Sequence, residues 1–335
     1  MLCKLIGLVG SCCYSSSTSA KISLLLRQLP VIANLGMEKC MGVTGIFYHP
    51  SFSRRSYLTQ GSRLQDFPEA IEPLLANPEF RLFESPAIDN DSILKVHTPE
   101  LIEEVKHDGL CSTAWHSVGG VVLAAETIAK GEIENAFAFI GAGGHHAGRD
   151  FFGGYCCFND VVIAIEVLRS KNLMRRFAIL DTDAHHGDGT RDLIKNDPEV
   201  LHVCMCGSNF CSPDGSKVDV ASPQARWHLP GSYTPPVVDM EYVSAAIDGF
   251  VPRATTFRPD LVFWYFGFDT HRGDYGSLGL TGKAYHEIAR AMRRASLDIC
   301  GGRLAVILGG GSRSDLARTL IPPIISILHE KIDAI

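Results

Sequence analysis

Short apolar runs alternate along the chain with longer stretches in which apolar residues recur every three or four positions. The short runs predict strands buried on both faces of a sheet, and the longer stretches predict helices. Strands are expected at residues 43–50, 81–83, 136–140, 177–180, 200–205, 260–266 and 304–308. Helices are expected at 67–76, from 99 onward, at 117–129, up to 168, near 191–195, at 240–252, at 282–300 and after 313. Because strands and helices alternate with no internal repeat or linker, we predict one α/β domain over residues 43–335, with a mainly parallel central sheet and helices on both faces.

Residues 1–42 do not follow this pattern. They begin with one positive charge, a very short apolar stretch and small residues before a cysteine, which is a poor match to a secretory signal. We interpret this segment as an N-terminal extension that is either disordered or mis-assigned, and we place it outside the predicted domain.

Composition narrows the classes of protein. A chain of 335 residues with 46% apolar content can bury a large core, and its net charge of −6 gives no sign of a nucleic-acid surface. No apolar run reaches the roughly 18 residues that a membrane span needs. The eleven cysteines include no C-x-x-C pair, and several lie in apolar runs, among them Cys204, Cys206 and Cys300. We therefore expect buried free thiols in a cytoplasmic enzyme, rather than a disulfide framework or a zinc knuckle.

The expected strand at 177–180 runs directly into a dense group of ionisable side chains. The next eight residues include Asp181, Thr182, Asp183, His185, His186 and Asp188. Burying carboxylates and imidazoles at a strand end is costly unless a cation offsets the charge. Asp183 and His185 are two residues apart, so an extended backbone directs both side chains to the same side. This stretch predicts a metal site at the carboxyl edge of the sheet, where open α/β sheets place their active sites.

Two further strands are expected to end in loops with similar chemistry. One loop carries His145 and His146, and the other carries Asp269. In a parallel sheet the three loops lie on one edge, so Asp183, His185 and Asp269 can form a three-ligand site that leaves a position open for water and substrate. The imidazole and the low ligand number favour zinc, with Fe(II) or Mn(II) as alternatives.

The adjacent histidines predict proton transfer. Gly143 and Gly144 permit the sharp turn that would bring both rings to one place. Asp181 and Asp188 are suited to orient the two imidazoles, because a carboxylate on the far nitrogen fixes the tautomer and raises basicity. One imidazole could then deprotonate water while the other carries a proton to the leaving group.

These motifs resemble those of the zinc-dependent histone deacetylases and their bacterial relatives, which include acetylpolyamine amidohydrolases and acetoin-utilisation proteins. The resemblance covers roughly residues 43–330 and rests on the segments 143–147 (GGHHA), 153–160 (GGYCCFND), 181–190 (DTDAHHGDGT) and 267–274 (GFDTHRGD). It implies the arginase/deacetylase-like fold, one zinc ion per chain held by Asp183, His185 and Asp269, and the pairs His145–Asp181 and His146–Asp188. The implied substrate is an acylated lysine, an acylated polyamine or another small amide, without direct nucleic-acid or membrane binding; an oligomer is left open.

The resemblance also implies a substrate tunnel and a second cation. Gly154 and Tyr155 would form part of the tunnel wall, where the family usually has Gly-Phe. The segment 207–219 is too long for a simple connection, so we expect it to line the site, with Phe210 as the second aromatic wall. A structural K⁺ would bind Asp181 and the backbone carbonyls of Asp183 and His185, but Cys204 stands at the position of the family's serine ligand.

The chain departs from the family at the end of its last expected strand. Relatives have Gly-Gly-Tyr there, and the phenol donates a hydrogen bond to the substrate carbonyl and then to the oxyanion. This chain has Gly309-Gly-Gly-Ser-Arg313, which puts Gly311 or Ser312 in place of the tyrosine. Losing one such donor slows a reaction about 10²–10³-fold unless another group replaces it. The candidate replacements are Tyr275, His271 and Arg313.

Two other functions stay open at this stage. An arginase-type ureohydrolase with two manganese ions would share the fold, but it needs more carboxylates than the single one in the segment 267–271. A weakly active protein that binds acyl-lysine would keep the pocket without the phenol. The presence of both His–Asp pairs argues against the second alternative, because binding alone needs no proton relay.

Overall fold

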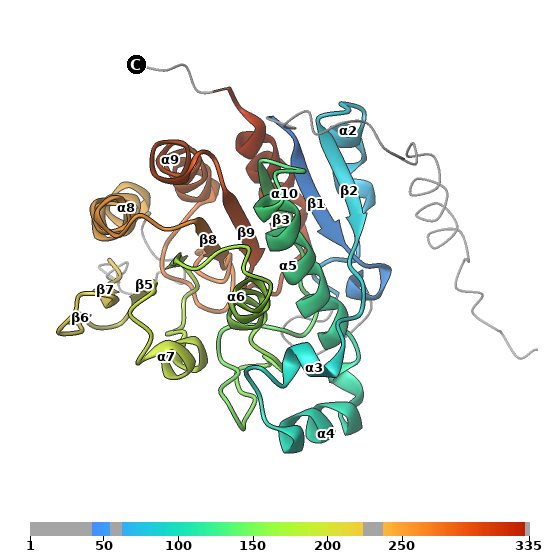
Figure 1. Cartoon of the computed structure of the whole chain (residues 1–335). Helices are drawn as coiled ribbons and strands as arrows, with labels where there is room; N and C mark the ends of the chain where they lie inside the picture. The colour runs from blue at the N-terminus through green and yellow to red at the C-terminus, as the bar shows by residue number, and fades with distance from the viewer. Residues whose placement is uncertain (1–41, 54–61, 224–236, 332–335) are drawn as a thin grey trace, which may run out of the picture. The chain divides into compact units, whose positions relative to one another are not determined.

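The computed structural model describes residues 42–53, 62–223 and 237–331. The N-terminal segment 1–42 lies, apart from Gly42, outside these residues. The described part contains a nine-stranded sheet in the order β2-β1-β3-β9-β8-β4-β5-β7-β6, in which every pairing but β6–β7 is parallel (Figure 1). The strands are β1 (Thr44–Tyr48), β2 (Phe80–Glu84), β3 (Asn135–Ala138), β4 (Phe177–Asp181), β5 (Val200–Cys206), β6 (Phe210–Cys211), β7 (Lys217–Ala221), β8 (Leu261–Phe266) and β9 (Leu304–Leu308). The predicted α/β fold with a mainly parallel sheet is confirmed.

Helices cover both faces of this sheet, as predicted. The chain moves in one direction along the sheet from β3 through α6 to β4, and in the opposite direction from β8 through α9 to β9. Right-handed crossovers therefore place α6 and α9 on opposite faces. In Figure 1, α5 and α6 lie together on one side, and α8 and α9 lie on the other. The helices are α2 (Glu72–Leu75), α3 (Asn90–Ile93), α4 (Pro99–His107), α5 (Ala114–Ala129), α6 (Asp160–Ser170), α7 (Asp188–Ile194), α8 (Asp239–Phe257), α9 (Gly282–Cys300) and α10 (Ser314–His329), with 3-10 turns at Pro50–Ser53, Glu69–Ile71 and Gly109–Cys111.

Local signals explain several helix ends. The hydroxyl of Thr98 accepts a hydrogen bond from the N–H of Leu101, and Pro99 occupies the first turn of α4, where its missing N–H costs nothing. Helix α9 ends at Gly301, which adopts a left-handed conformation (φ +67°). The helix expected at 67–76 is instead a 3-10 turn followed by the four-residue α2.

The segment 207–219 was predicted to be a long loop, and this prediction is wrong. It contains β6 and the start of β7, which pair antiparallel at the edge of the sheet. The side chain of Lys217 is buried and donates hydrogen bonds to the carbonyl oxygens of Asp197 and Val200. Those two bonds anchor the start of β7 beside β5.

The expectation of free thiols holds only in part. Cys204, Cys206 and Cys300 are buried free thiols, but Cys111 and Cys157 form a disulfide. The two residues are 46 positions apart in the sequence, a separation that carries no signal of pairing. The bond joins the 3-10 turn Gly109–Cys111 to the loop that follows Tyr155.

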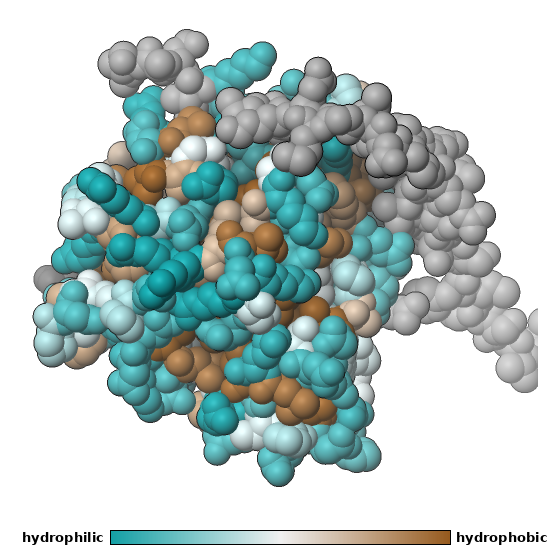
Figure 2. Space-filling view, in the orientation of Figure 1, coloured by the Kyte–Doolittle hydropathy of each residue, from teal (hydrophilic) through white to brown (hydrophobic). Residues whose placement is uncertain are grey.

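The described surface is mainly hydrophilic with apolar residues interspersed, as seen from the side shown in Figure 2. Such a mixture is ordinary for a folded domain. Among the described residues, no helix is both long enough and apolar enough to cross a membrane.

Candidate active site

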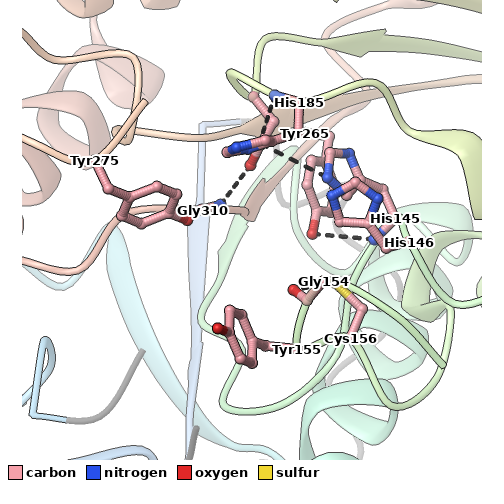
Figure 3. A pocket seen from close by; sticks show the side chains of 10 residues that line it. His145, His146, Gly154, Tyr155, Cys156, His185, Tyr265, Tyr275 and Gly310 are labelled. Atoms are coloured by element: carbon pink, nitrogen blue, oxygen red, sulfur yellow. Dashed lines mark hydrogen bonds and ion pairs between the residues drawn. The ribbon is translucent and has the colours of Figure 1, made fainter. Parts of the chain in front are cut away.

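Four neighbouring strands of the sheet, β3, β9, β8 and β4, end at a common cavity. Because these strands are parallel, their carboxyl ends meet at one edge, and the loops that follow them supply most of the lining. The cavity has a volume of about 290 Å³, which is near the lower end of ligand pockets, roughly 300–1,000 Å³. It is lined by His145, His146, Gly154, Tyr155, Cys156, Asp183, His185, Tyr265, Tyr275 and Gly310 (Figure 3).

The three predicted metal ligands lie together at this cavity. The Nδ1 atom of His185 is 3.1 Å from Oδ1 of Asp183 and 3.0 Å from Oδ2 of Asp269. One ligand atom from each residue lies within 4.8 Å of the other two. Asp183 and Asp269 are buried, and the backbone approaches them closely, since a Cβ atom at Gly310 would stand 2.6 Å from Oδ2 of Asp183.

The electrostatics of these carboxylates fit a bound divalent cation. Burial and the charge of Asp183 raise the pKa of Asp269 above its ordinary value. Among the described residues, the buried Oδ2 of Asp269 has the imidazole of His185 beside it at 3.0 Å but no hydrogen bond of good geometry. Two buried carboxylates facing each other are unfavourable without a positive charge between them. Carboxylate oxygens together with an imidazole nitrogen form a donor set that suits zinc.

Both predicted histidine–aspartate contacts are present. The Nδ1 of His145 lies 2.7 Å from Asp181, and the Nδ1 of His146 lies 2.6 Å from Asp188. The two imidazole rings are 4.2 Å apart at 64°. Each Nδ1 faces a carboxylate, so each imidazole carries its proton there and has its Nε2 available for another partner.

The surroundings push the pKa values of the two histidines apart. Burial disfavours the charged form of His145, but the carboxylates of Asp181 and Asp183 outweigh it and raise the pKa of His145 to about 9. Burial, together with the neighbouring His145, lowers the pKa of His146. A divalent cation held by Asp183 would offset part of the negative charge that acts on His145.

Two glycines allow the chain to pack against these rings. Gly144 adopts φ +148°, and a Cβ atom there would lie 2.4 Å from the hydroxyl of Tyr265. Gly154 adopts φ +52°, and a Cβ atom there would lie 2.2 Å from the ring of His146. The backbone at residue 154 therefore forms the cavity wall directly against His146, and Tyr155 follows it with φ +67°.

Tyr275 lies at the cavity, whereas the predicted positions Gly311 and Ser312 do not line it. The phenol ring of Tyr275 stacks on His185 at 5.7 Å, and its oxygen accepts a hydrogen bond of 3.1 Å from the N–H of Gly311. The hydroxyl of Ser312 instead donates to Asp274 at 2.9 Å. Gly311 has φ +123°, and a Cβ atom there would lie 2.3 Å from the ring of Phe268. A tyrosine at 311 would thus be strained as well as blocked.

Three other candidates lie outside the cavity. Phe210, expected as the second aromatic wall, lies on β6, is 49% exposed and packs against the guanidinium of Arg191 at 5.8 Å. The Nδ1 of His271 accepts a hydrogen bond from the N–H of Gly273, and Arg313 pairs with Asp315. The β6–β7 pairing carries Phe210 away, because it holds residues 210–211 at the far edge of the sheet.

The sequence reasoning missed three residues at the site. Tyr265 lies near the carboxyl end of β8, its ring stacks on His145 at 4.7 Å, and its hydroxyl accepts a hydrogen bond from the N–H of His145. Cys156 lines the cavity beside Gly154. Arg63 is buried and donates to the carbonyl oxygens of Gly309 and Gly311, which fixes the loop after β9. A tyrosine near the carboxyl end of an apolar strand is a signal that could have been used, whereas nothing near Arg63 in the sequence points to its role.

Comparison with known proteins agrees with this geometry. The family model described as the histone deacetylase domain matches residues 58–326. A probable deacetylase of Archaeoglobus fulgidus is 28% identical over 295 residues, which cover 80% of this chain and 81% of that protein. These matches support a hydrolase that acts on amide bonds.

Human proteins and a solved structure give the same picture. Histone deacetylase 9 is 31% identical over 206 residues and histone deacetylase 7 is 32% identical over 208 residues; both matches cover 58% of this chain but only about a fifth of the human protein. The crystal structure of the HDA15 HD domain superposes with a TM-score of 0.73 at 23% identity, covering 86% of this chain and 89% of that domain, and confirms the arginase/deacetylase fold. The chain belongs to the histone deacetylase family.

Proposed function

We propose that this protein is a zinc-dependent amidohydrolase that removes acetyl-like groups from acylated lysine, an acylated polyamine or a related amine. The observation that carries the proposal is that a three-ligand set and two imidazole–carboxylate pairs share one cavity. Asp183, His185 and Asp269 would hold one zinc ion. When bound, zinc makes a water molecule more acidic and polarises the amide carbonyl.

The two histidines have different roles. His146, with its lowered pKa, is neutral near pH 7 and accepts a proton from the attacking water at Nε2. It then returns that proton to the amine that leaves. Asp188 holds the ring of His146 in the tautomer that this requires. His145, which is deeply buried against Asp181, favours the charged form and stabilises negative charge that develops on the substrate.

Tyr275 supplies the hydrogen bond for which the family uses a tyrosine after its last strand. Its oxygen accepts from the N–H of Gly311, so the O–H remains free to donate to the substrate carbonyl. Burial of the phenol and the charge of Asp269 raise the pKa of Tyr275, which keeps it protonated at neutral pH. We assign to it the role of oxyanion donor.

The shape of the cavity supports a slender substrate with a small acyl group. The volume is about 290 Å³, and the aromatic side chains of Tyr155 and Tyr275 lie across from His145 and His146 (Figure 3). We infer that these two rings flank the alkyl chain of the substrate, while the backbone at Gly154 packs directly against His146. A structural K⁺ at Asp181 stays a prediction of the family resemblance.

The test is an assay of the purified protein after chelation and stepwise return of zinc. Acetyl-lysine peptides, acetylated polyamines and trifluoroacetyl-lysine are offered as substrates, with arginine included to detect ureohydrolase activity. We expect zinc-dependent release of the free amine and no urea. Binding of acyl-lysine without turnover of any amide would replace this proposal by the binding alternative, and urea release with manganese would replace it by the ureohydrolase.

A further inference from the structure

A second group of metal-ligating side chains lies close to the active-site loop but outside its cavity. It consists of His186, Cys204, Cys206 and Asp219, and one ligand atom of each lies within 4.8 Å of those of the others. Both cysteines are buried free thiols. We propose that these four residues form a second zinc site, distinct from the one at Asp183, His185 and Asp269.

The sheet creates this cluster. Cys204 and Cys206 are two residues apart on β5, so their side chains lie on the same face. Cys204 pairs in parallel register with Asp219 on β7 and with Asp181 on β4. The chain leaving β4 then brings His186 over the two thiols. His185 and His186 are adjacent, and only His185 lines the active-site cavity.

An unpartnered nitrogen points to a ligand at this place. Within the described part of the chain, the buried Nδ1 atom of His186 has no partner at good hydrogen-bond geometry, and the thiol of Cys206 lies close to this imidazole. This Nδ1 atom lies 3.7 Å from Oδ1 of Asp219. Zinc bonds to nitrogen and oxygen of about 2.1 Å set these atoms about 3.4 Å apart in a tetrahedron, so a small contraction would complete the site. Two thiolates, an imidazole and a carboxylate are all zinc ligands, and the set differs from the Cys2His2 set of structural zinc by one carboxylate in place of an imidazole.

Arg191 completes the charge balance. Its guanidinium donates to Oδ1 of Asp219 at 2.6 Å and to the carbonyl oxygen of Val218. Two thiolates and one carboxylate carry three negative charges, and zinc with the guanidinium carries three positive charges. A ligating carboxylate is commonly held by such an outer hydrogen bond. The guanidinium of Arg191 also lies over the ring of Phe210, 5.8 Å from its centroid.

The two cysteine thiols at this cluster indicate which metal it would bind. Thiolates favour zinc over potassium, calcium or magnesium, which prefer oxygen ligands. Cys204, at the position of the family's serine ligand for potassium, would serve zinc here. An ion at this site would join β5 and β7 to the loop that carries His185, and so fix the position of a ligand of the first metal.

Cobalt substitution tests the proposal because, of the two ligand sets, the second alone contains sulfur. Thiolate bound to Co²⁺ produces an intense near-ultraviolet charge-transfer band, and the set Asp183, His185 and Asp269 contains no sulfur. Protein that has been chelated, reduced and reloaded with Co²⁺ should show this band and bind two equivalents of metal. Cys206→Ala should lose the band and one equivalent, while Asp269→Ala should keep the band.

Cys300→Ser is the matched control, because it removes a buried free thiol that bonds only to backbone oxygens in α9 and before β9. It should keep both the band and the metal count. If Cys206→Ala does not fold, His186→Gln gives the same comparison with both thiols retained, and its band should weaken or shift. Absence of the band in reduced wild-type protein with all thiols accessible to titration after denaturation would overturn the proposal. A Cys204–Cys206 disulfide that persists after reduction would also overturn it.

Discussion

The backbone N–H of Gly311 donates a 3.1 Å hydrogen bond to the phenolic oxygen of Tyr275. This contact joins the loop after β9 to the loop after β8. It leaves the phenol with one proton to give, beside the three-ligand set and at a cavity that Gly311 itself does not line. Tyr275 thereby brings a hydroxyl to the cavity from a neighbouring loop, where no tyrosine follows β9.

Replacement of Tyr275 by phenylalanine should slow hydrolysis of acetyl-lysine about 10²–10³-fold, which corresponds to roughly 2.7–4 kcal/mol of lost oxyanion stabilisation. The loss should appear in kcat rather than in KM, because the hydrogen bond strengthens as charge develops. Trifluoroacetyl-lysine should lose less, since its oxyanion is intrinsically more stable. Steady-state kinetics on both substrates measures the difference.

Tyr48→Phe is the matched control for this variant. It also removes one phenolic hydroxyl, which donates to the carbonyl oxygen of Phe67 at 2.8 Å, but it lies away from the cavity. It should lower stability by about 1 kcal/mol and leave kcat unchanged. Equal rates for wild type and Tyr275→Phe on acetyl-lysine would remove Tyr275 from the mechanism.

Strand endings made the centre of the site predictable. The apolar run before Asp181 predicted a buried strand. The spacing of Asp183 and His185 predicted that both side chains lie on one side of the chain. The parallel sheet then brought Asp269 to them, as expected. Pairing at the sheet edge was not predictable, because Phe210 and Lys217 lie in a stretch rich in polar and turn-forming residues. The position of Tyr275 depends on its contact with Gly311, which lies 36 residues away.

Removal of any one of the three proposed ligands should cost the active-site metal. We expect Asp183→Ala, His185→Ala and Asp269→Ala each to lose one equivalent of zinc and all turnover, because a three-ligand site cannot spare a donor. The zinc content per chain is measured by elemental analysis, and circular dichroism verifies that each variant is folded. Full zinc content in all three variants would contradict the assignment.

His146→Ala should greatly slow turnover while leaving metal content and fold intact. The proposed role of His146 is to move a proton, and loss of a general base typically costs about 10²–10⁴-fold. Asp188→Asn should give a smaller loss, since the ring remains but its Nδ1 proton is held less firmly. Turnover of His146→Ala within tenfold of wild type, at every pH between the acid and alkaline limits of stability, would exclude this role.

His97 is a buried histidine away from the cavity, and both of its nitrogens are in use. Nδ1 donates to the carbonyl oxygen of Gly148 at 2.7 Å, and Nε2 accepts from the N–H of Asn159 at 3.0 Å. Burial lowers the pKa of His97 from 6.5 to about 4. Protonation of Nε2 would bring a second N–H group against the backbone N–H of Asn159. The folded protein therefore disfavours the charged form of His97.

The free energy of unfolding should therefore decrease as the pH is lowered from about 6.5 to about 4. As the pH decreases, the unfolded chain binds this proton near pH 6.5 and the folded chain only near pH 4, so the free energy of unfolding declines between these values. The full decline amounts to roughly 3–4 kcal/mol, at about 1.4 kcal/mol for each tenfold difference in proton affinity. His97→Gln, which keeps a donor and an acceptor but does not titrate, should lack this contribution. Exposed His107→Gln is the control and should retain the wild-type pH dependence. Urea unfolding at pH 7, 6, 5 and 4 compares the three proteins, and parallel curves for wild type and His97→Gln would show that His97 titrates alike in both states.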